Sequence, residues 1–203
     1  MSRVGVLISG RGTNLQALID AARLGRLAGE IAVVISNVES APGLDRARAV
    51  GVPTAFRDHR GRHRDEFDRE IASILEHHGV DLVCLAGYLR LLSPEFVRGF
   101  AARILNVHPS LLPAFPGLEA QRKAWEHGVK VSGATVHLVD ESLDRGPIVL
   151  QEAVPVLESD TPETLALRIL EAEHRIYPRA VRILIEGRYR IEGRRVVLTE
   201  NRA

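Results

Sequence analysis

The first half of the chain alternates short apolar runs with longer segments in which apolar residues recur every three or four positions. The short runs are rich in Val, Ile and Leu and almost continuous, which is typical of strands that are covered on both faces. This pattern predicts strands at Val4–Ser9, Ile31–Ser36, Pro53–Phe56, Leu82–Ala86 and Ile104–His108.

The segments between these runs have helical periodicity. Residues Asn14–Leu24 place their apolar side chains on one side, and a similar stripe is formed by Phe67, Ile71, Ile74 and Leu75. Strands that alternate with helices at this spacing indicate βαβ units. We therefore expect an α/β fold with a doubly wound, mostly parallel, Rossmann-like sheet.

The pattern changes after residue 108. The segment PSLLPAFPGLEA (109–120) holds three prolines and a glycine, too many for a helix or a central strand. After a short helix, Val131–Val139 and Ile148–Val156 predict two strands joined by a loop, for which antiparallel pairing is expected. A long C-terminal helix should begin after Thr161 and end at Gly187, and a hairpin should follow it. We expect residues 1–203 to form a single domain.

The bulk composition excludes several classes of protein. Hydrophobic residues make up 45% and charged residues 26% of the 203 positions, as in an ordinary globular protein. A net charge of +1 gives no general attraction to nucleic acid or to an anionic membrane. No apolar run approaches the roughly 20 residues of a membrane helix, and no secretory signal is evident. We expect a cytoplasmic protein without an intramolecular disulfide, because Cys84 is the only cysteine.

The segment SGRGTN (9–14) lies between the first strand and the first helix. Consecutive N–H groups in a Gly-rich turn at a helix N-terminus form an anion site. It differs from a dinucleotide fingerprint, because Leu15 replaces the third glycine and the second strand ends in Ser36-Asn37 rather than in an acid. The segment therefore fits a single phosphate group, or else a tight turn that binds nothing.

The segment ILNVHPSLLP (104–113) places two polar side chains at the end of a buried strand. Asn106 and His108 are two residues apart, so they point the same way, and ligands of open α/β sheets bind at these strand ends. The alternative is a turn-capping Asn and a satisfied core His. The Pro-rich segment that follows favours a binding site, because its prolines would make it a rigid loop that could form one side of such a site.

A third segment, DESLDRGPI (140–148), contains Asp144 directly before the turn Arg145-Gly146-Pro147. This turn would hold the carboxylate inward, although acids in loops are usually solvated. His137 lies in a predicted strand and is interpreted as structural. The remaining histidines show no metal-ligand spacing, so we predict no metal site.

These segments together resemble the phosphoribosylglycinamide formyltransferase family. The resemblance covers almost the whole chain, through VLISGRGTNLQALIDA, LAGYLRLLSPEFV, LNVHPSLLPAFPG, VHLVDESLDRGPI and EAEHRIYP. NVHPSLLP followed by LDRGPI is specific for folate-dependent formyl transfer, and SGRGTN with PAFPG narrows it to the glycinamide enzymes. The reaction implied moves a formyl group from 10-formyltetrahydrofolate to glycinamide ribonucleotide in purine biosynthesis, without a metal and in a monomer or homodimer.

The resemblance also implies roles for individual residues. Asn106, His108 and Asp144 match the catalytic triad, and Glu173 matches a residue that touches the substrate ribose. The backbone of Gly12, Thr13 and Asn14 would hold the substrate phosphate. The folate cleft would be lined by Arg64, Leu89, Arg90, Leu91, Leu92, Asn106, Asp140, Glu141, Ser142, Leu143 and Asp144.

This resemblance implies a simple direct transfer. The neutral amine would attack the formyl carbon, and Asn106 with protonated His108 would stabilise the oxyanion. Asp144 would pair with the His108 cation and position a proton-relaying water. The chain departs from the family in one place, where Glu119 and Gln121 stand at positions often held by histidine.

Two alternatives remain open at the level of sequence. One is another folate-dependent formyltransferase or hydrolase of the same superfamily. We expect neither the tRNA-binding domain of the methionyl-tRNA enzymes nor the N-terminal regulatory domain of the hydrolases. The other is a non-catalytic phosphate- or nucleotide-binding module, which predicts that Asn106, His108 and Asp144 do not converge.

Overall fold

The computed structural model of the chain describes residues 1–199. Its strands are β1 (Ser2–Ile8), β2 (Gly29–Ser36), β3 (Thr54–Phe56), β4 (Leu82–Leu85), β5 (Ile104–His108), β6 (Val131–Leu138), β7 (Ile148–Pro155), β8 (Tyr189–Glu192) and β9 (Arg195–Leu198). Its helices are α1 (Thr13–Arg23), α2 (Pro42–Ala49), α3 (Arg64–His77), α4 (Pro94–Gly99), α5 (Ala120–Glu126) and α6 (Pro162–Glu186).

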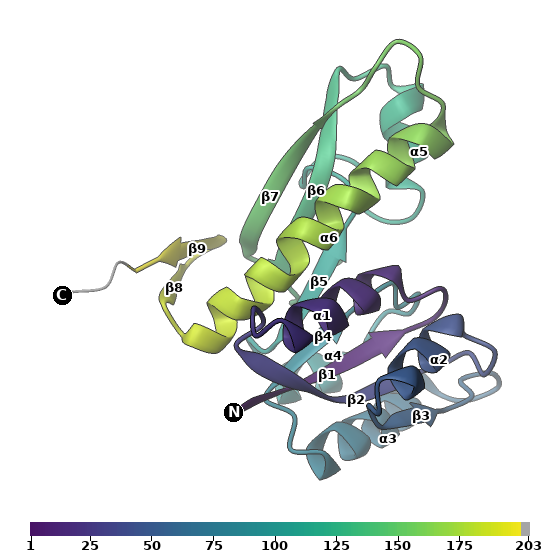
Figure 1. Cartoon of the computed structure of the whole chain (residues 1–203), viewed down its shortest axis with the longest axis vertical. Helices are drawn as coiled ribbons and strands as arrows, with labels where there is room; N and C mark the ends of the chain where they lie inside the picture. The colour runs from purple at the N-terminus through teal and green to yellow at the C-terminus, as the bar shows by residue number, and fades with distance from the viewer. Residues whose placement is uncertain (200–203) are drawn as a thin grey trace.

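The strands form one sheet in the order β3-β2-β1-β4-β5-β6-β7-β9-β8. Pairing is parallel from β3 through β5 and antiparallel between β5, β6 and β7. The terminal hairpin β8–β9 joins the sheet beside β7 and projects beyond the end of α6 (Figure 1). The predicted Rossmann-like sheet with an antiparallel C-terminal part and a long C-terminal helix is therefore confirmed.

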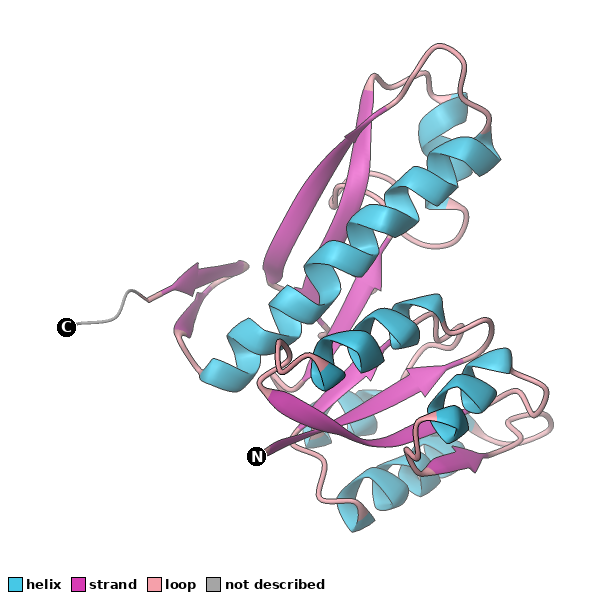
Figure 2. Ribbon diagram, viewed as in Figure 1, coloured by secondary structure: helices cyan, strands magenta, loops and turns pink. Residues whose placement is uncertain are grey.

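Helices cover both faces of the parallel part of the sheet (Figure 2). One hydrophobic core joins the sheet to α1, α2 and α6, and a second core joins it to α3 and α4. Adjacent strand residues serve opposite cores, as Val6 packs in the first and Leu7 in the second. This arrangement explains why the strand sequences are apolar at nearly every position.

The long helix α6 fixes the two halves of the sheet to each other. It lies across β5, β6 and β7 and also packs against α1 (Figure 1). The buried hydroxyl of Tyr177 donates toward the carbonyl oxygens of Leu85 and Leu105, at 3.0 and 3.2 Å. The predicted N-cap is confirmed, because the Thr161 hydroxyl accepts the N–H of Thr164.

Two short helices were not predicted from the sequence. Helix α2 has eight residues and α4 has six, so neither repeats an apolar stripe often enough to be recognised. Both begin with proline, which suits the first turn of a helix. No helix within residues 1–199 is both long enough and apolar enough to cross a membrane.

Candidate active site

Asn106 and His108 lie at the carboxyl end of β5, between β4 and β6. The strand pleat directs both side chains to the same face, as the sequence predicts. His108 is almost completely buried, whereas Asn106 is half-buried. The loops after β1 and β4 reach the same edge of the sheet, because all three strands run parallel.

Asp144 reaches His108 from the loop between β6 and β7. One carboxylate oxygen, Oδ2, lies 3.6 Å from His108 Nδ1, and both side chains are only 7% exposed. The same oxygen accepts the backbone N–H of Gly117 at 2.8 Å. Asp144 adopts a φ of 52°, which is uncommon for a residue other than glycine. The carboxylate is therefore held inward, and the alternative of a solvated loop acid does not apply.

The turn that delivers Asp144 depends on Gly146. A Cβ at position 146 would collide with the carbonyl oxygen of Leu138, so the backbone of the turn can pack against β6 only with glycine there. This close approach gives a physical reason for glycine at position 146.

His137, which the sequence analysis interprets as structural, also lies in this cluster. Its register partner across the sheet is Asn106, whose Nδ2 lies 3.2 Å from His137 Nε2. His137 Nδ1 lies 2.9 Å from the Leu138 carbonyl oxygen, which can only accept. Nδ1 therefore carries the proton, and Nε2 accepts one N–H of the Asn106 amide. Burial lowers the pKa of His137, which favours this neutral form.

These contacts connect the three predicted catalytic residues. His137 Nε2 lies 3.7 Å from Asp144 Oδ1, so His137 lies beside both Asn106 and Asp144, although with its proton on Nδ1 it donates no hydrogen bond to the carboxylate. Asn106 keeps a second amide N–H that His137 does not use. Within the part of the chain that the structure describes, the cluster thus offers an amide donor without a partner beside an imidazole–carboxylate pair.

The Pro-rich segment 109–119 forms one wall of the cluster. The carbonyl oxygen of Phe115 accepts a hydrogen bond from His108 Nε2 at 2.9 Å, so this nitrogen carries a proton. The hydroxyl of Ser110 donates to the carbonyl of Ala114 at 2.6 Å and stabilises the same bend. Phe115 has a φ of 51°, which is uncommon for a residue other than glycine.

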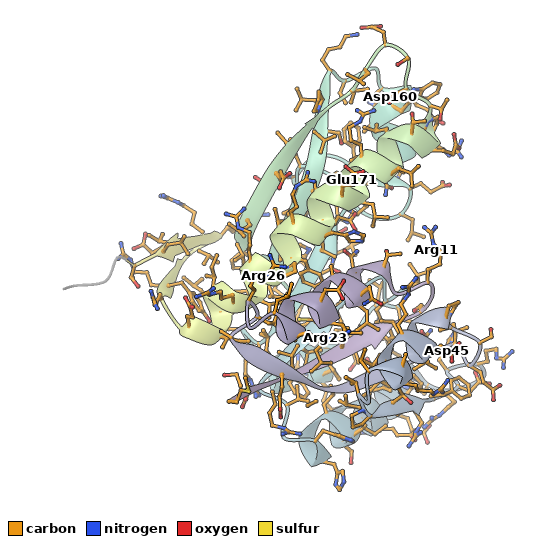
Figure 3. The ribbon with its side chains drawn as sticks, viewed as in Figure 1. Arg11, Arg23, Arg26, Asp45, Asp160 and Glu171 are labelled. Carbon is orange, nitrogen blue, oxygen red and sulfur yellow. The ribbon has the colours of Figure 1, made fainter. Side chains whose placement is uncertain are left out.

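The Gly-rich turn runs from β1 into α1. Gly12 has a φ of 68° and precedes the helix, and no side chain of the described residues caps that helix end. The first N–H groups of a helix have no partner within the helix, so those of Thr13 and Asn14 are free to bind an anion. The exposed side chain of Arg11 extends from this turn (Figure 3).

Asn14 and Glu173 join this turn to α6. Asn14 Nδ2 donates to Glu173 Oε2 at 2.6 Å, and both residues are buried. Burial raises the pKa of Glu173 from 4.5 to about 7, although the Asn14 amide opposes the shift. The Asn14 oxygen Oδ1 is buried and has no partner among residues 1–199. Unpaired buried polar atoms of this kind are frequent where a ligand binds.

The predicted folate residues after β4 differ in orientation. Leu89 and Leu91 are 72% and 58% exposed, and Leu92 is partly buried. The guanidinium of Arg90 lies over the ring of Phe67 at 4.6 Å, and so packs against α3. Arg64, the first residue of α3, is exposed. Of the two arginines, only Arg64 is presented to solvent as a surface charge.

The segment 140–143 precedes Asp144 and is exposed throughout. The carboxylate of Asp140 accepts the N–H of Ser142 at 2.8 Å, which forms a local turn. Glu141 pairs with Arg98 of α4 at 3.0 Å, and Leu143 is 54% exposed. The segment therefore offers backbone groups and one apolar side chain at the rim of the cluster.

Glu119 and Gln121, the positions at which the sequence departs from the pattern it resembles, lie near the start of α5. Glu119 precedes the helix with a φ of 58° and lies 3.9 Å from Arg122. Within residues 1–199, no group of three or more His, Cys, Asp or Glu side chains is arranged to hold a metal ion.

Comparison with known proteins identifies a family for this arrangement. Residues 2–181 match the formyl transferase family. The phosphoribosylglycinamide formyltransferase of Escherichia coli (strain K12) is 42% identical over 192 residues, covering 92% of this chain and 88% of that protein. The crystal structure of glycinamide ribonucleotide transformylase 1 from Symbiobacterium toebii is 59% identical, with a TM-score of 0.97, and the match covers 98% of this chain and 95% of that one.

The trifunctional purine biosynthetic protein adenosine-3 of Homo sapiens is 49% identical over 187 residues, which are 92% of this chain but 18% of that protein. The chain thus spans about a fifth of the length of its trifunctional relatives. The match to the single-function bacterial enzymes covers nearly their whole length. The chain belongs to the formyl transferase family and, within it, to the phosphoribosylglycinamide formyltransferases.

Proposed function

We propose that this chain transfers the formyl group of 10-formyltetrahydrofolate to the amine of glycinamide ribonucleotide. The products are formylglycinamide ribonucleotide and tetrahydrofolate, in purine biosynthesis. One observation carries the proposal: Asn106, His108 and Asp144 converge around His137 at the carboxyl end of β5. A non-catalytic phosphate-binding module does not require this convergence.

The Gly-rich turn is proposed as the site of the substrate phosphate. The N–H groups of Gly12, Thr13 and Asn14 suit a dianion at the start of α1, and Arg11 adds positive charge. Glu173 lies against Asn14, within reach of a ribose attached to that phosphate. The unpaired oxygen of Asn14 supports this position for the sugar, because a ribose hydroxyl would donate to it.

The folate is proposed to lie along the loop after β4. The exposed side chains of Leu89, Leu91 and Leu143 would cover the aromatic parts of the folate, since solvent-exposed apolar side chains gain from burial. The backbones of residues 89–92 and 140–144 would bind the polar edge of the pterin. Arg64 would face the acidic tail, at a surface site where the contact is modest and sensitive to salt.

The chemistry follows from the donors that the cluster offers. The amine attacks the formyl carbon, and the free N–H of Asn106 stabilises the oxyanion together with protonated His108. Asp144 stabilises the His108 cation and positions a water that carries the amine proton to the departing folate nitrogen. No covalent intermediate is needed.

This mechanism requires His108 to change its hydrogen-bond partner. Its Nε2–H donates to the Phe115 carbonyl, so the substrate oxyanion must replace or share that acceptor. An oxyanion is a stronger acceptor than a carbonyl, and the exchange therefore favours the transition state.

Release of tetrahydrofolate, followed by absorbance with glycinamide ribonucleotide as acceptor, tests the proposal. Transfer predicts release that depends on the acceptor and yields one formylated product per folate. Release without acceptor would instead show a hydrolase, and binding of ligand without release would show a binding module. We propose that the enzyme acts in the cytoplasm as a monomer or homodimer, on these two small molecules and without a metal, nucleic acid or membrane.

A further inference from the structure

Ser9 is the last residue before the Gly-rich turn, and it belongs to the same segment that is proposed to hold the substrate phosphate. Its contacts, however, lead to the loop after β4. The backbone N–H of Ser9 donates to the Gly87 carbonyl at 3.1 Å, and the Ser9 hydroxyl accepts the N–H of Leu89 at 2.9 Å. Both partners lie in the loop that is proposed to bind folate.

The Ser9 hydroxyl is itself oriented by a buried partner. It donates to Asn37 Oδ1 at 2.6 Å, and both side chains are buried. Because the single hydroxyl proton is committed to Asn37, its lone pairs face the Leu89 N–H. Asn37 follows β2, so three parallel strands contribute to this one network through their carboxyl ends.

The network continues beneath the same loop. Asn37 contacts the imidazole of His59, whose Nδ1 lies 3.1 Å from the Asn37 carbonyl oxygen. His59 packs edge-on against Phe67, with ring centroids 6.3 Å apart. Arg90 covers the ring of Phe67. The loop is thus held at Leu89 by Ser9 and at Arg90 by Phe67.

We propose that Ser9 is a positioning residue for the folate. Its side chain holds the backbone of Leu89, while the following backbone N–H groups serve the phosphate of the other substrate. The segment 9–14 would therefore contribute to both ligand sites. The side chain of Ser9 would position the folate loop, and the backbone N–H groups of residues 12–14 would bind the phosphate of glycinamide ribonucleotide. This inference rests on the proposed function, because it assumes that residues 89–92 bind folate.

Ser9→Ala tests this proposal. Removal of the hydroxyl leaves the Leu89 N–H and the Asn37 oxygen without their partner. We expect the dissociation constant for tetrahydrofolate, measured by calorimetric titration, to rise roughly tenfold, as for a lost buried hydrogen bond. The dissociation constant for glycinamide ribonucleotide and the kcat at saturating folate should stay within about twofold, since the hydroxyl touches no reacting group.

Ser36→Ala is the matched control. Ser36 is also buried at the end of a neighbouring strand, but its hydroxyl bonds to the backbone of Val38 and to no other group among residues 1–199. The folate affinity of the Ser36→Ala variant should equal that of the unmodified protein. Ser9→Thr keeps the hydroxyl and should recover most of the affinity that Ser9→Ala loses.

Three results would overturn the inference. These are unchanged folate affinity in Ser9→Ala, equal losses for both ligands, and no recovery in Ser9→Thr. If Ser9→Ala does not fold, as judged by its melting curve, Asn37→Ala decides, because it removes the partner that orients the hydroxyl and predicts a selective loss of folate affinity. Failure of the proposed function would appear separately, as the absence of acceptor-dependent tetrahydrofolate release by the unmodified protein.

Discussion

Glu173→Gln should make the protein more stable at alkaline pH and leave its stability unchanged in acid. Glu173 is buried on α6, and its only hydrogen bond among the described residues comes from Asn14. Burial raises the pKa of this carboxyl from 4.5 to about 7. The unfolded chain ionises the same group in water at its ordinary pKa.

The size and direction of the effect follow from these two values. Below pH 4.5 the carboxyl is protonated in both states, so it imposes no penalty on folding. Between pH 4.5 and 7 the unfolded state loses its proton more readily, and the free energy of unfolding falls as pH rises. At 1.36 kcal/mol for each pKa unit, the loss reaches about 3 kcal/mol above pH 7. Glutamine keeps the acceptor for Asn14 and removes this loss.

Urea unfolding at pH 4.5 and pH 8 measures the effect as a difference between variants. Glu171→Gln is the matched control, because Glu171 lies on the same helix but is exposed (Figure 3). The stability gain of Glu173→Gln should appear at pH 8 alone, together with weaker binding of glycinamide ribonucleotide. An equal gain at both pH values would show that ionisation of a buried carboxyl is not the cause.

Three further substitutions test other parts of the structure. His108→Ala should lower kcat at least about 100-fold while the protein stays folded, and retention of most turnover would remove His108 from the chemistry. Tyr177→Phe should lower the free energy of unfolding by about 1–2 kcal/mol without changing kcat, because the hydroxyl donates to strand carbonyls inside the core; equal urea midpoints would contradict this. Gly12→Ala should lower the melting temperature, since its Cβ would lie 2.6 Å from Gly43 at a positive φ, whereas Gly10→Ala has open space and should not. Similar melting curves for the two variants would refute that explanation.

The sequence predicts the strands of this fold well, because buried strands are apolar at nearly every position, whereas the helices between them are apolar only at every third or fourth position. The run Ile104–His108 has the bounds that the pattern predicts, and β6 differs by a single residue at its end. The short helices α2 and α4 escape prediction because periodicity needs several turns to appear. The order of the strands in the sheet cannot be predicted from local patterns, because the pairing of β1 with β4 depends on contacts between residues far apart in the sequence.

The candidate site is predictable only in part. Asn106 and His108 can be placed together from strand alternation alone, since they are two positions apart. Asp144 lies far along the chain, and only the family resemblance joins it to them. His137 could be recognised only from the register of β5 against β6, which pairs it with Asn106. The guanidinium of Arg90 packs against Phe67 of α3. The sequence alone does not distinguish an arginine that packs in this way from one that lines a folate site.

The close contact at Gly146 has a consequence for engineering the acceptor or folate preference of this enzyme. Any larger residue there must push the turn away from β6 and carry Asp144 with it, so the damage would appear as lost turnover in a protein that still folds. In a mutational screen for turnover, substitutions at position 146 would therefore resemble substitutions of the catalytic residues, although Gly146 is not proposed to contact a substrate. Residues 140–143 are exposed in the same loop, so new side chains there would meet solvent rather than the packed core. A library that randomises 140–143 and fixes 144–146 would explore new specificities without moving the carboxylate.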